Sequence, residues 1–447
     1  MLLKFSFENF RSFYDKQEIS FEHEFNNANI FKNNTIFEYK VNKKKRAVLN
    51  GAIIFGANAS GKTNIILAFS QMRKLYLDSI KFDKREDFTL RPKEFIFNNN
   101  NNVPIVFSVE FMKFIEDDYY KIIYKFSINH KNLFIEKETL SYQIVKKTTL
   151  SNEIILFERS GDSILYNSPE IDEIINKVKQ ENIKYKLILS LLNFDINNTF
   201  FKSEVETLSF KLIEVCGMAI EKDLIFSNES KNLDEFIEEI DNNSHFKEYI
   251  LDNLYKYDFA LSDFEIEDIT EDFIDAFKAN GVLGSLNDKE RERVLVDLRK
   301  VKRYKINSIH NLDNKNYELP LSHESAGTNK FLKHSLKIYE SILMEKVYIT
   351  DEFDSHYHIF IQEGIINNFV YPESPSKTQF LLITHNPLLM NKKFFSKEQI
   401  YFVEKERSNQ CSNIFSLKDF NNISYNNHNW VNLYLSGRMG AVPEVFD

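Results

Sequence analysis

Apolar and polar positions change their period twice along the chain, and these changes divide it into three parts. Residues 1–25 alternate with a period of two, which predicts an edge hairpin, and further alternating runs up to about residue 165 predict a mainly antiparallel sheet. From about 169 to 258, apolar residues recur at helical spacing and predict four or five helices. The last third returns to short apolar runs, which are typical of buried parallel strands.

A buried strand predicted at 48–55 and three strands predicted in the last third form the core. The runs at 347–350 and 380–383 are of the buried parallel type, and a final strand is expected at 399–403. The first run is far from the others in sequence, so the core has to be assembled from both ends of the chain around an insertion. The pattern therefore predicts an α/β fold with a split core, an antiparallel β lobe and an inserted helical domain. We expect an N-terminal lobe, a helical insertion and a C-terminal lobe at residues 1–168, 169–303 and 304–447.

The first core strand runs directly into a glycine-rich segment, Gly56-Ala57-Asn58-Ala59-Ser60-Gly61-Lys62-Thr63. This segment matches the phosphate-binding pattern G-x-x-x-x-G-K-[ST], with a strand before it and a helix predicted from near Thr63. Its glycines let successive backbone N–H groups converge on a phosphate, and the helix dipole adds to the attraction. We expect Lys62 to reach the β- and γ-phosphates of a nucleotide and Thr63 to hold Mg²⁺. The alternative is an ordinary glycine-rich turn between a strand and a helix.

Two acids end the strand at 347–350. In P-loop ATPases the first acid holds Mg²⁺ and a second can orient or deprotonate the attacking water, which would be the roles of Asp351 and Glu352. The alternative is a strand that ends in a solvated turn. The next core strand ends at His385, which is placed to hydrogen-bond a γ-phosphate or the attacking water, or simply to cap a helix.

A polar segment, Ser325-Ala326-Gly327-Thr328, precedes the helix expected at about 330–343. A hydroxyl and free N–H groups at a helix start can bind an anion. Taken alone, the segment is better explained as a helix N-cap.

Composition narrows the setting of this chemistry. The 447 residues carry a net charge of −9, which argues against a surface that is basic all over. The sharpest basic cluster, 43–46, is interpreted as a solvated turn rather than a nucleic-acid site. Two cysteines give no disulfide framework, and no stretch reaches about 18 uncharged apolar residues. We therefore expect a cytoplasmic protein without a membrane segment.

Taken together, the order of these motifs resembles the ABC-type ATPases of the SMC, RecF and OLD class. The segment 7–13, which contains Arg11, is similar to the first strand of that class, and 56–64, including Asn64, to its Walker A motif. The other matching motifs are a signature at 324–328, Walker B at Asp351 and Glu352, a D-loop at Asp354 and a switch histidine at His385.

The form of the signature and the tail segment 434–443 resemble a narrower group, the compact single-chain ATPases of bacterial phage-defence loci. That group includes abortive-infection ATPases, RloA-like proteins and the ATPase subunit of PARIS-type systems.

This resemblance implies that the chain binds ATP and Mg²⁺ and acts as a homodimer or a ring of dimers. Ser325 and Gly327 would contact the nucleotide bound at Lys62 of another copy, and Arg11 would lie against the nucleotide. Glu352, His385 and Lys62 would be catalytic, while Thr63 and Asp351 would hold the metal. The nucleotide would be bound by Gly56, Asn58, Ala59, Ser60, Gly61, Lys62, Thr63, Asn64, Ser325, Gly327 and Arg11.

The resemblance also implies a role in anti-phage defence. The protein would sense a phage protein or DNA and control a separately encoded effector nuclease or toxin. A DNA-repair or recombination ATPase of the RecF or SMC type, which binds DNA directly, is the alternative.

Overall fold

The chain separates into two compact units in the computed structural model. Unit 1 comprises Met1–Phe226, Met344–Asp354 and Ile365–Asp447, and unit 2 comprises Ser227–Leu343 and Ser355–Gly364. The residues that the structure describes are 1–25, 34–88, 91–97, 103–146, 148–179, 181–198, 207–227, 233–280, 287–423 and 428–443. Within these ranges, none of the helices combines the length and apolar character needed to cross a membrane.

A six-stranded sheet forms the core of unit 1, and its order is β12-β16-β17-β6-β18-β19. All neighbours are parallel except β18 and β19, which form an antiparallel pair. The strands are β6 (Gly51–Gly56), β12 (Leu224–Phe226), β16 (Val347–Thr350), β17 (Gln379–Ile383), β18 (Ile400–Lys405) and β19 (Ser412–Ser416). Strand β6 comes from the N-terminal part of the chain and lies between β17 and β18. This arrangement confirms the predicted split α/β core.

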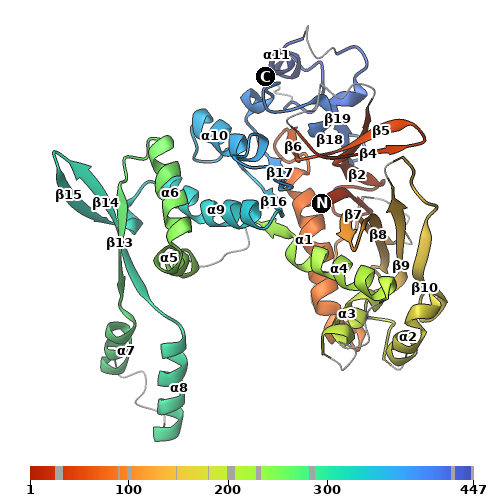
Figure 1. Ribbon diagram of the computed structural model, residues 1–447, viewed down its shortest axis with the longest axis horizontal. Coiled ribbons are helices and arrows are strands. Elements are labelled where there is room, and N and C mark those ends of the chain that lie inside the picture. Colours follow the sequence, from red (N-terminus) through yellow and green to blue (C-terminus); the bar gives the residue numbers. More distant parts are fainter. Residues whose placement is uncertain are drawn as a thin grey trace. The chain divides into compact units, whose positions relative to one another are not determined.

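A seven-stranded antiparallel sheet forms the second layer of unit 1, in the order β11-β10-β9-β8-β7-β1-β2 (Figure 1). Its strands are β1 (Leu2–Glu8), β2 (Gln17–Ser20), β7 (Ile105–Ile115), β8 (Asp118–Asn129), β9 (Phe134–Val145), β10 (Ile154–Ser160) and β11 (Ser163–Asn167). The predicted antiparallel lobe is thus confirmed. The predicted edge hairpin is confirmed, because β1 and β2 form an antiparallel pair at the end of this sheet, with β2 as the edge strand.

Four helices pack with these sheets in one hydrophobic core. They are α1 (Lys62–Asp78), α2 (Asp172–Val178), α3 (Ile188–Asn198) and α4 (Leu208–Lys222). The ring of Phe69 on α1 stacks on Phe5 of β1, and both side chains are fully buried. The C-terminal helix α11 (Trp430–Leu435) and α10 (Ile359–Val370) complete the helices that unit 1 contains in whole or in part. Helices α2, α3 and α4 therefore belong with the antiparallel sheet, while the predicted boundaries at 168/169 and 303/304 stay a prediction.

A small sheet, β3-β5-β4, contains most of the basic cluster of the N-terminal region. Its strands are β3 (Glu22–Phe25), β4 (Thr35–Val41) and β5 (Lys44–Leu49). The cluster was expected in a turn, but only Lys43 lies there, and the remaining positions belong to β5. Lys44 pairs with Glu24 at 2.7 Å and Arg46 with Glu22 at 3.2 Å, so acids on the neighbouring strand offset this charge.

Two local predictions in unit 1 were wrong for tertiary reasons. The single strand expected at 48–55 is two strands, β5 and β6, which enter different sheets because the chain changes direction at Asn50. The run 95–97, one of the runs before residue 165 that were expected to be strands, is not a strand, because Ile96 and Phe97 form an exposed turn.

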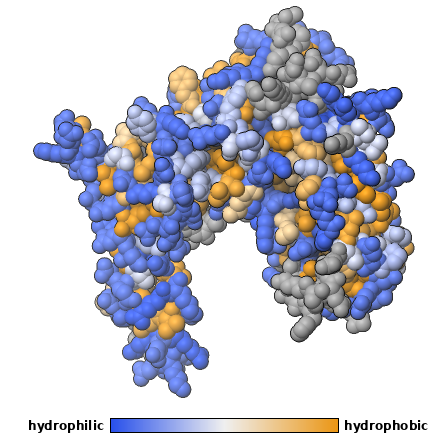
Figure 2. All heavy atoms as spheres, in the orientation of Figure 1, coloured by the Kyte–Doolittle hydropathy of each residue, from blue (hydrophilic) through white to orange (hydrophobic). Residues whose placement is uncertain are grey.

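Unit 2 is built on a three-stranded antiparallel sheet, β13-β14-β15, with helices around it. The strands are β13 (Asp263–Asp268), β14 (Tyr304–Leu312) and β15 (Lys315–Pro320), and the helices are α5 (Leu233–Asn242), α6 (Ser244–Lys256), α7 (Thr270–Ala279), α8 (Asp288–Lys300) and α9 (Ala326–Leu343). Figure 1 shows α7 and α8 as a pair at the far ends of β13 and β14. Helix α8 is solvated, and none of its residues is buried. Figure 2 shows this pair as a mainly hydrophilic surface with one hydrophobic patch.

Candidate functional site

The glycine-rich segment forms a tight turn between β6 and α1. Gly61 is the N-cap of α1 with φ 109°, and Ala59 has φ 60°, so two positions adopt the left-handed conformation that such a loop needs. Asn58, Ala59 and Thr63 are exposed, whereas Lys62 is buried. Helix α1 has no acid in its first turn, so nothing there repels an anion.

Two serines from distant parts of the chain contact the turn and leave no room for a side chain at its second glycine, Gly61. A Cβ atom at Gly61 would lie 2.6 Å from the Ser12 hydroxyl and 2.7 Å from the Ser412 hydroxyl. Ser412 donates a hydrogen bond to the Ser60 carbonyl at 2.6 Å, and Ser12 accepts one from Asn64 at 2.9 Å. The loop is thus held from both sides, and a side chain at Gly61 would displace these contacts.

The amine of Lys62 turns back into the loop. Its Nζ donates to the carbonyl oxygens of Gly56 at 2.8 Å and Ala57 at 2.7 Å. Burial lowers the pKa of Lys62 to about 8, and the carboxylates of Asp351, Asp354 and Glu352 offset part of this effect. At neutral pH the amine is therefore still mostly charged, with carbonyl partners that phosphate oxygens can replace.

The pKa of Lys62 predicts that nucleotide binding takes up a proton in alkaline solution. Phosphate groups favour the charged amine, so binding should raise this pKa above about 8, and ATP affinity should fall as the pH rises through about 8. Calorimetry of ATP binding at pH 8.5, in buffers of different ionisation enthalpy, measures the uptake. In Lys62→Arg the side chain stays charged at this pH, so this variant should bind ATP without taking up a proton. An equal uptake by both proteins would contradict the assignment.

The two predicted acids lie immediately after β16. Asp351 is half-buried and accepts a hydrogen bond from the Glu352 backbone N–H at 2.9 Å. Glu352 is exposed and has φ 47°, a conformation that a glutamate rarely adopts. A strained backbone persists only where the surrounding structure holds it, and such residues cluster at functional sites.

His385 lies just after the neighbouring strand β17, and its backbone is hydrogen-bonded to a third acid, Asp354. The Asp354 carboxylate accepts hydrogen bonds from the Thr384 hydroxyl at 2.8 Å and from the His385 backbone N–H at 3.0 Å. Burial, followed by the positive charge of Lys62, lowers the pKa of His385. The imidazole is therefore neutral at pH 7 and can accept or donate one hydrogen bond.

These residues meet at one edge of the core sheet. Strands β6, β17 and β16 are neighbours and parallel, so the residues after their carboxyl ends lie together. The three carboxylates Asp351, Glu352 and Asp354 raise the pKa of Lys62 and also that of His385, against the lowering by burial. All five groups are therefore close enough to interact electrostatically. The sequence predicted each of these positions, and the structure brings them together.

Arg11 lies in the turn between β1 and β2, next to Ser12, which contacts the loop. Its backbone has φ 53°, its N–H donates to the Lys93 carbonyl, and its guanidinium lies over the ring of Phe10. The turn itself therefore adjoins the phosphate loop, while a contact of Arg11 with nucleotide stays a prediction.

Ser325 and Gly327 lie in unit 2, at the start of α9. The Ser325 hydroxyl accepts a hydrogen bond from the Thr328 N–H at 3.0 Å, so this serine is an N-cap, and its side chain is exposed. A Cβ atom at Gly327 would lie 2.8 Å from the His356 carbonyl, which requires glycine for reasons within the same chain. The Ser325 hydroxyl also lies 2.8 Å from the Thr328 hydroxyl, and either of these two groups can be the donor.

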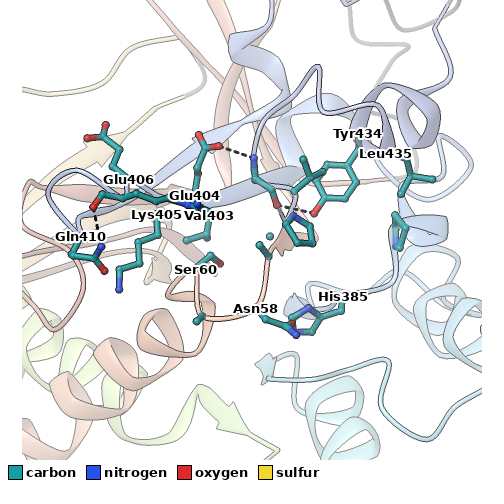
Figure 3. Close-up of a pocket in the computed structure, with 18 residues that line it drawn as sticks. Asn58, Ser60, His385, Val403, Glu404, Lys405, Glu406, Gln410, Tyr434 and Leu435 are labelled. Carbon is teal, nitrogen blue, oxygen red and sulfur yellow. Dashed lines mark hydrogen bonds between the residues drawn. The ribbon is translucent and has the colours of Figure 1, made fainter. Parts of the chain in front are cut away.

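A pocket of about 960 Å³ opens beside the phosphate loop (Figure 3). Its walls come from the loop, from His385 and Pro387, from the turn between β18 and β19, and from the C-terminal tail. The ring of Tyr434 stacks on Phe402, and its hydroxyl donates to the Ala441 carbonyl at 3.0 Å. Glu404 accepts a hydrogen bond from the Ala441 N–H at 3.1 Å. These bonds fold the tail segment 434–443 back against the strand that neighbours β6.

The residues present fit a nucleotide with Mg²⁺. Lys62 and the free N–H groups of α1 suit phosphates, and the buried Ser60 hydroxyl has no hydrogen-bond partner. Thr63 and Asp351 offer oxygen ligands, and Mg²⁺ usually combines one or two such protein ligands with water and phosphate. Among the described residues no group of three His, Cys, Asp or Glu side chains is suited to a metal, so a closed all-protein site is not formed there.

Fold and site together define a P-loop nucleotide-binding protein of the α/β class. The chain belongs to the family described as "AAA domain, putative AbiEii toxin, Type IV TA system", which matches residues 52–391. It is also similar to the SMC head domain from Thermotoga maritima, with 15% sequence identity, 93% of this chain and 98% of that chain covered, and a TM-score of 0.35. A search of the curated proteins found no match. The prediction of a P-loop ATPase family is thereby confirmed.

Sequence reasoning did not identify Ser12, Ser412 or Glu404 as parts of this region. Ser12 and Ser412 are ordinary polar residues in sequence, and only the fold brings them to Gly61. The tail segment 434–443 was recognised in the sequence by its resemblance to a family motif. Its glycines at 437 and 440 both have positive φ, and they are the local signal that the tail forms tight turns.

Proposed function

We propose that this protein is an ABC-type ATPase that binds and hydrolyses ATP with Mg²⁺ between two copies of the chain. We further propose that it is the sensor and regulatory subunit of a bacterial abortive-infection system and controls a separately encoded effector nuclease or toxin. The observation that carries the first proposal is the convergence of Lys62, Asp351, Glu352 and His385 at one edge of the core sheet.

Each residue at this edge has a role that fits its environment. Lys62 exchanges two carbonyl partners for phosphate oxygens, Glu352 accepts a proton from the attacking water, and neutral His385 hydrogen-bonds the γ-phosphate or that water. Thr63 and Asp351 would hold Mg²⁺, which would offset the charge of the phosphate groups. Asp354 fixes the backbone of His385 and so holds this group in place.

The shared site is supported by the exposed start of α9 in unit 2. Ser325 and Ala326 are exposed, and the first N–H groups of an 18-residue helix favour an anion. The γ-phosphate bound in a second copy is the anion that we propose for them. Rings built from such dimers are equally compatible with this contact.

The defence role is supported by the family description, which names a putative AbiEii toxin and a type IV toxin–antitoxin system. The narrower proposal of RloA-like or PARIS-type relatives rests on the sequence resemblance of the signature and of the tail at 434–443, which forms part of the wall beside the phosphate loop. The trigger would be a phage protein or DNA. Direct DNA repair is not favoured by the basic cluster at 43–46, since Lys44 and Arg46 are paired with acids.

Light scattering tests the shared site. In a Glu352→Gln background, we expect ATP and Mg²⁺ to convert the protein into a dimer or a multiple of it, because the nucleotide then bridges two copies. Ser325→Arg should abolish this change, whereas Ser163→Arg, at an exposed serine of β11, should not. A protein that stays monomeric with ATP while hydrolysing it would contradict the shared site and leave Ser325 as a helix cap.

A further inference from the structure

The residue before Ser325, Glu324, is anchored inside unit 2. Its side chain is only 10% exposed, although it adjoins two exposed residues. The carboxylate accepts a hydrogen bond from the Ser308 hydroxyl and lies 2.7 Å from Nε2 of His310. A half-buried carboxylate with two such partners is held in one position.

His310 makes hydrogen-bond contacts through both of its ring nitrogens. Its Nδ1 lies 2.9 Å from the Ala260 carbonyl oxygen. Its Nε2 lies 2.7 Å from a carboxyl oxygen of Glu324 and 3.4 Å from the Ser308 hydroxyl. The two side chains that hold Glu324 therefore also lie close to each other, and a hydrogen bond to a carboxyl group is stronger than an ordinary surface contact.

Both anchoring residues stand on one face of the central strand of unit 2. Ser308 and His310 are two residues apart on β14, which pairs with β13 on one side and with β15 on the other. The main chain of this loop is held as well, because the side-chain amide of Asn329 donates hydrogen bonds to the backbone carbonyls of Leu321 and Glu324. The loop is thus tied down on the inside while Ser325 points outward.

We propose that Ser308 and His310 are positioning residues for the Ser325 end of α9. By holding Glu324 they fix the orientation in which the exposed serine hydroxyl and the first helix N–H groups meet the phosphate of a second copy. This inference rests on the proposed shared site. It assigns a function to two polar residues of unit 2 that belong to none of the sequence motifs.

The test compares two substitutions of His310 in the Glu352→Gln background. His310→Leu removes the bond to Glu324, whereas His310→Gln retains an N–H that can donate to it. We expect His310→Leu to weaken ATP-dependent self-association by about 10-fold or more, as the loss of a charge-assisted hydrogen bond does. His310→Gln should recover most of this loss. ATP affinity measured at protein concentrations too low for association should be unchanged in both, because Lys62 belongs to unit 1.

A third protein separates positioning from a general effect on the fold. In a Ser325→Ala background, His310→Leu should cause no further loss of association, because its effect acts through the serine. An undiminished loss there, or equal losses for His310→Leu and His310→Gln, would overturn the inference while leaving the shared site intact. If the parent protein does not associate with ATP at all, the proposed shared site is wrong and the inference is overturned with it.

Discussion

Glu352→Gln should lower the rate of ATP hydrolysis by about 10²- to 10⁴-fold, the usual contribution of a positioned general base. The amide cannot take a proton from water, but it has the shape of the carboxylate and should leave Lys62 and the phosphate loop undisturbed. Nucleotide affinity should therefore be retained. Steady-state phosphate release and binding of a fluorescent ATP analogue measure the two effects separately.

The chain offers a matched control at the other end of the same strand. Glu345 precedes β16, is exposed and has φ 52°, close to the φ of 47° at Glu352. Glu345→Gln should hydrolyse ATP at the parent rate, since it lies at the amino end of β16, away from the edge where Lys62 lies. Cells carrying the chain with its neighbouring genes should lose phage protection with Glu352→Gln and keep it with Glu345→Gln. Retained turnover in Glu352→Gln would reject this residue as the base.

The candidate site could be predicted from the sequence because its chemistry is local. Asp351 and His385 lie at the ends of short apolar runs, and Lys62 lies at the end of the glycine-rich loop that follows another such run. Parallel strands bring their carboxyl ends to one edge whatever the lengths of chain between them. The split core followed from the same runs. The position of a residue at the end of a parallel strand can therefore be predicted once the strands are recognised.

Contacts that depend on the fold of distant segments could not be predicted in this way. Ser12 and Ser412 lie 400 residues apart and meet at Gly61 only after two sheets have formed. The strand expected at 48–55 was wrong because one apolar run supplies two sheets, and hydropathy does not mark the change of direction at Asn50. The His310–Glu324 bond likewise joins a strand to a loop without any sequence signal.

The largest surprise of this kind is a buried ion pair in the antiparallel sheet. Glu138 on β9 and Arg159 on β10 lie among polar residues in sequence, yet both side chains are fully buried and joined at 3.1 Å. The Glu138 carboxylate also accepts bonds from Tyr124 and from the N–H groups of Ile188 and Leu189 at the start of α3. Glu138 therefore bonds the start of α3 to the sheet, in addition to the hydrophobic core that α3 shares with it.

Arg159→Met should lower the free energy of unfolding by about 3–5 kcal/mol, the usual cost of removing one partner from a buried pair. The substitution leaves a buried carboxylate without its positive partner. It also removes donors from the carbonyls of Ile183 and Lys186, both bound at 2.7 Å. Urea unfolding followed by the fluorescence of Trp430, the single tryptophan of the chain and a buried residue of unit 1, measures this loss.

The pairing of Arg299 with Glu271 provides the matched control, because the same two residue types meet at 2.9 and 3.3 Å on the surface of unit 2. Water screens that pair, so Arg299→Met should leave the thermal unfolding of the protein by calorimetry nearly unchanged, whereas Arg159→Met should lower its midpoint clearly. In a double-mutant cycle, Glu138→Gln should cost much less once Arg159 has been replaced, since the carboxylate is then already unpaired. Additive losses, or a loss for Arg159→Met as small as that for Arg299→Met, would show that burial of this pair does not hold α3 on the sheet.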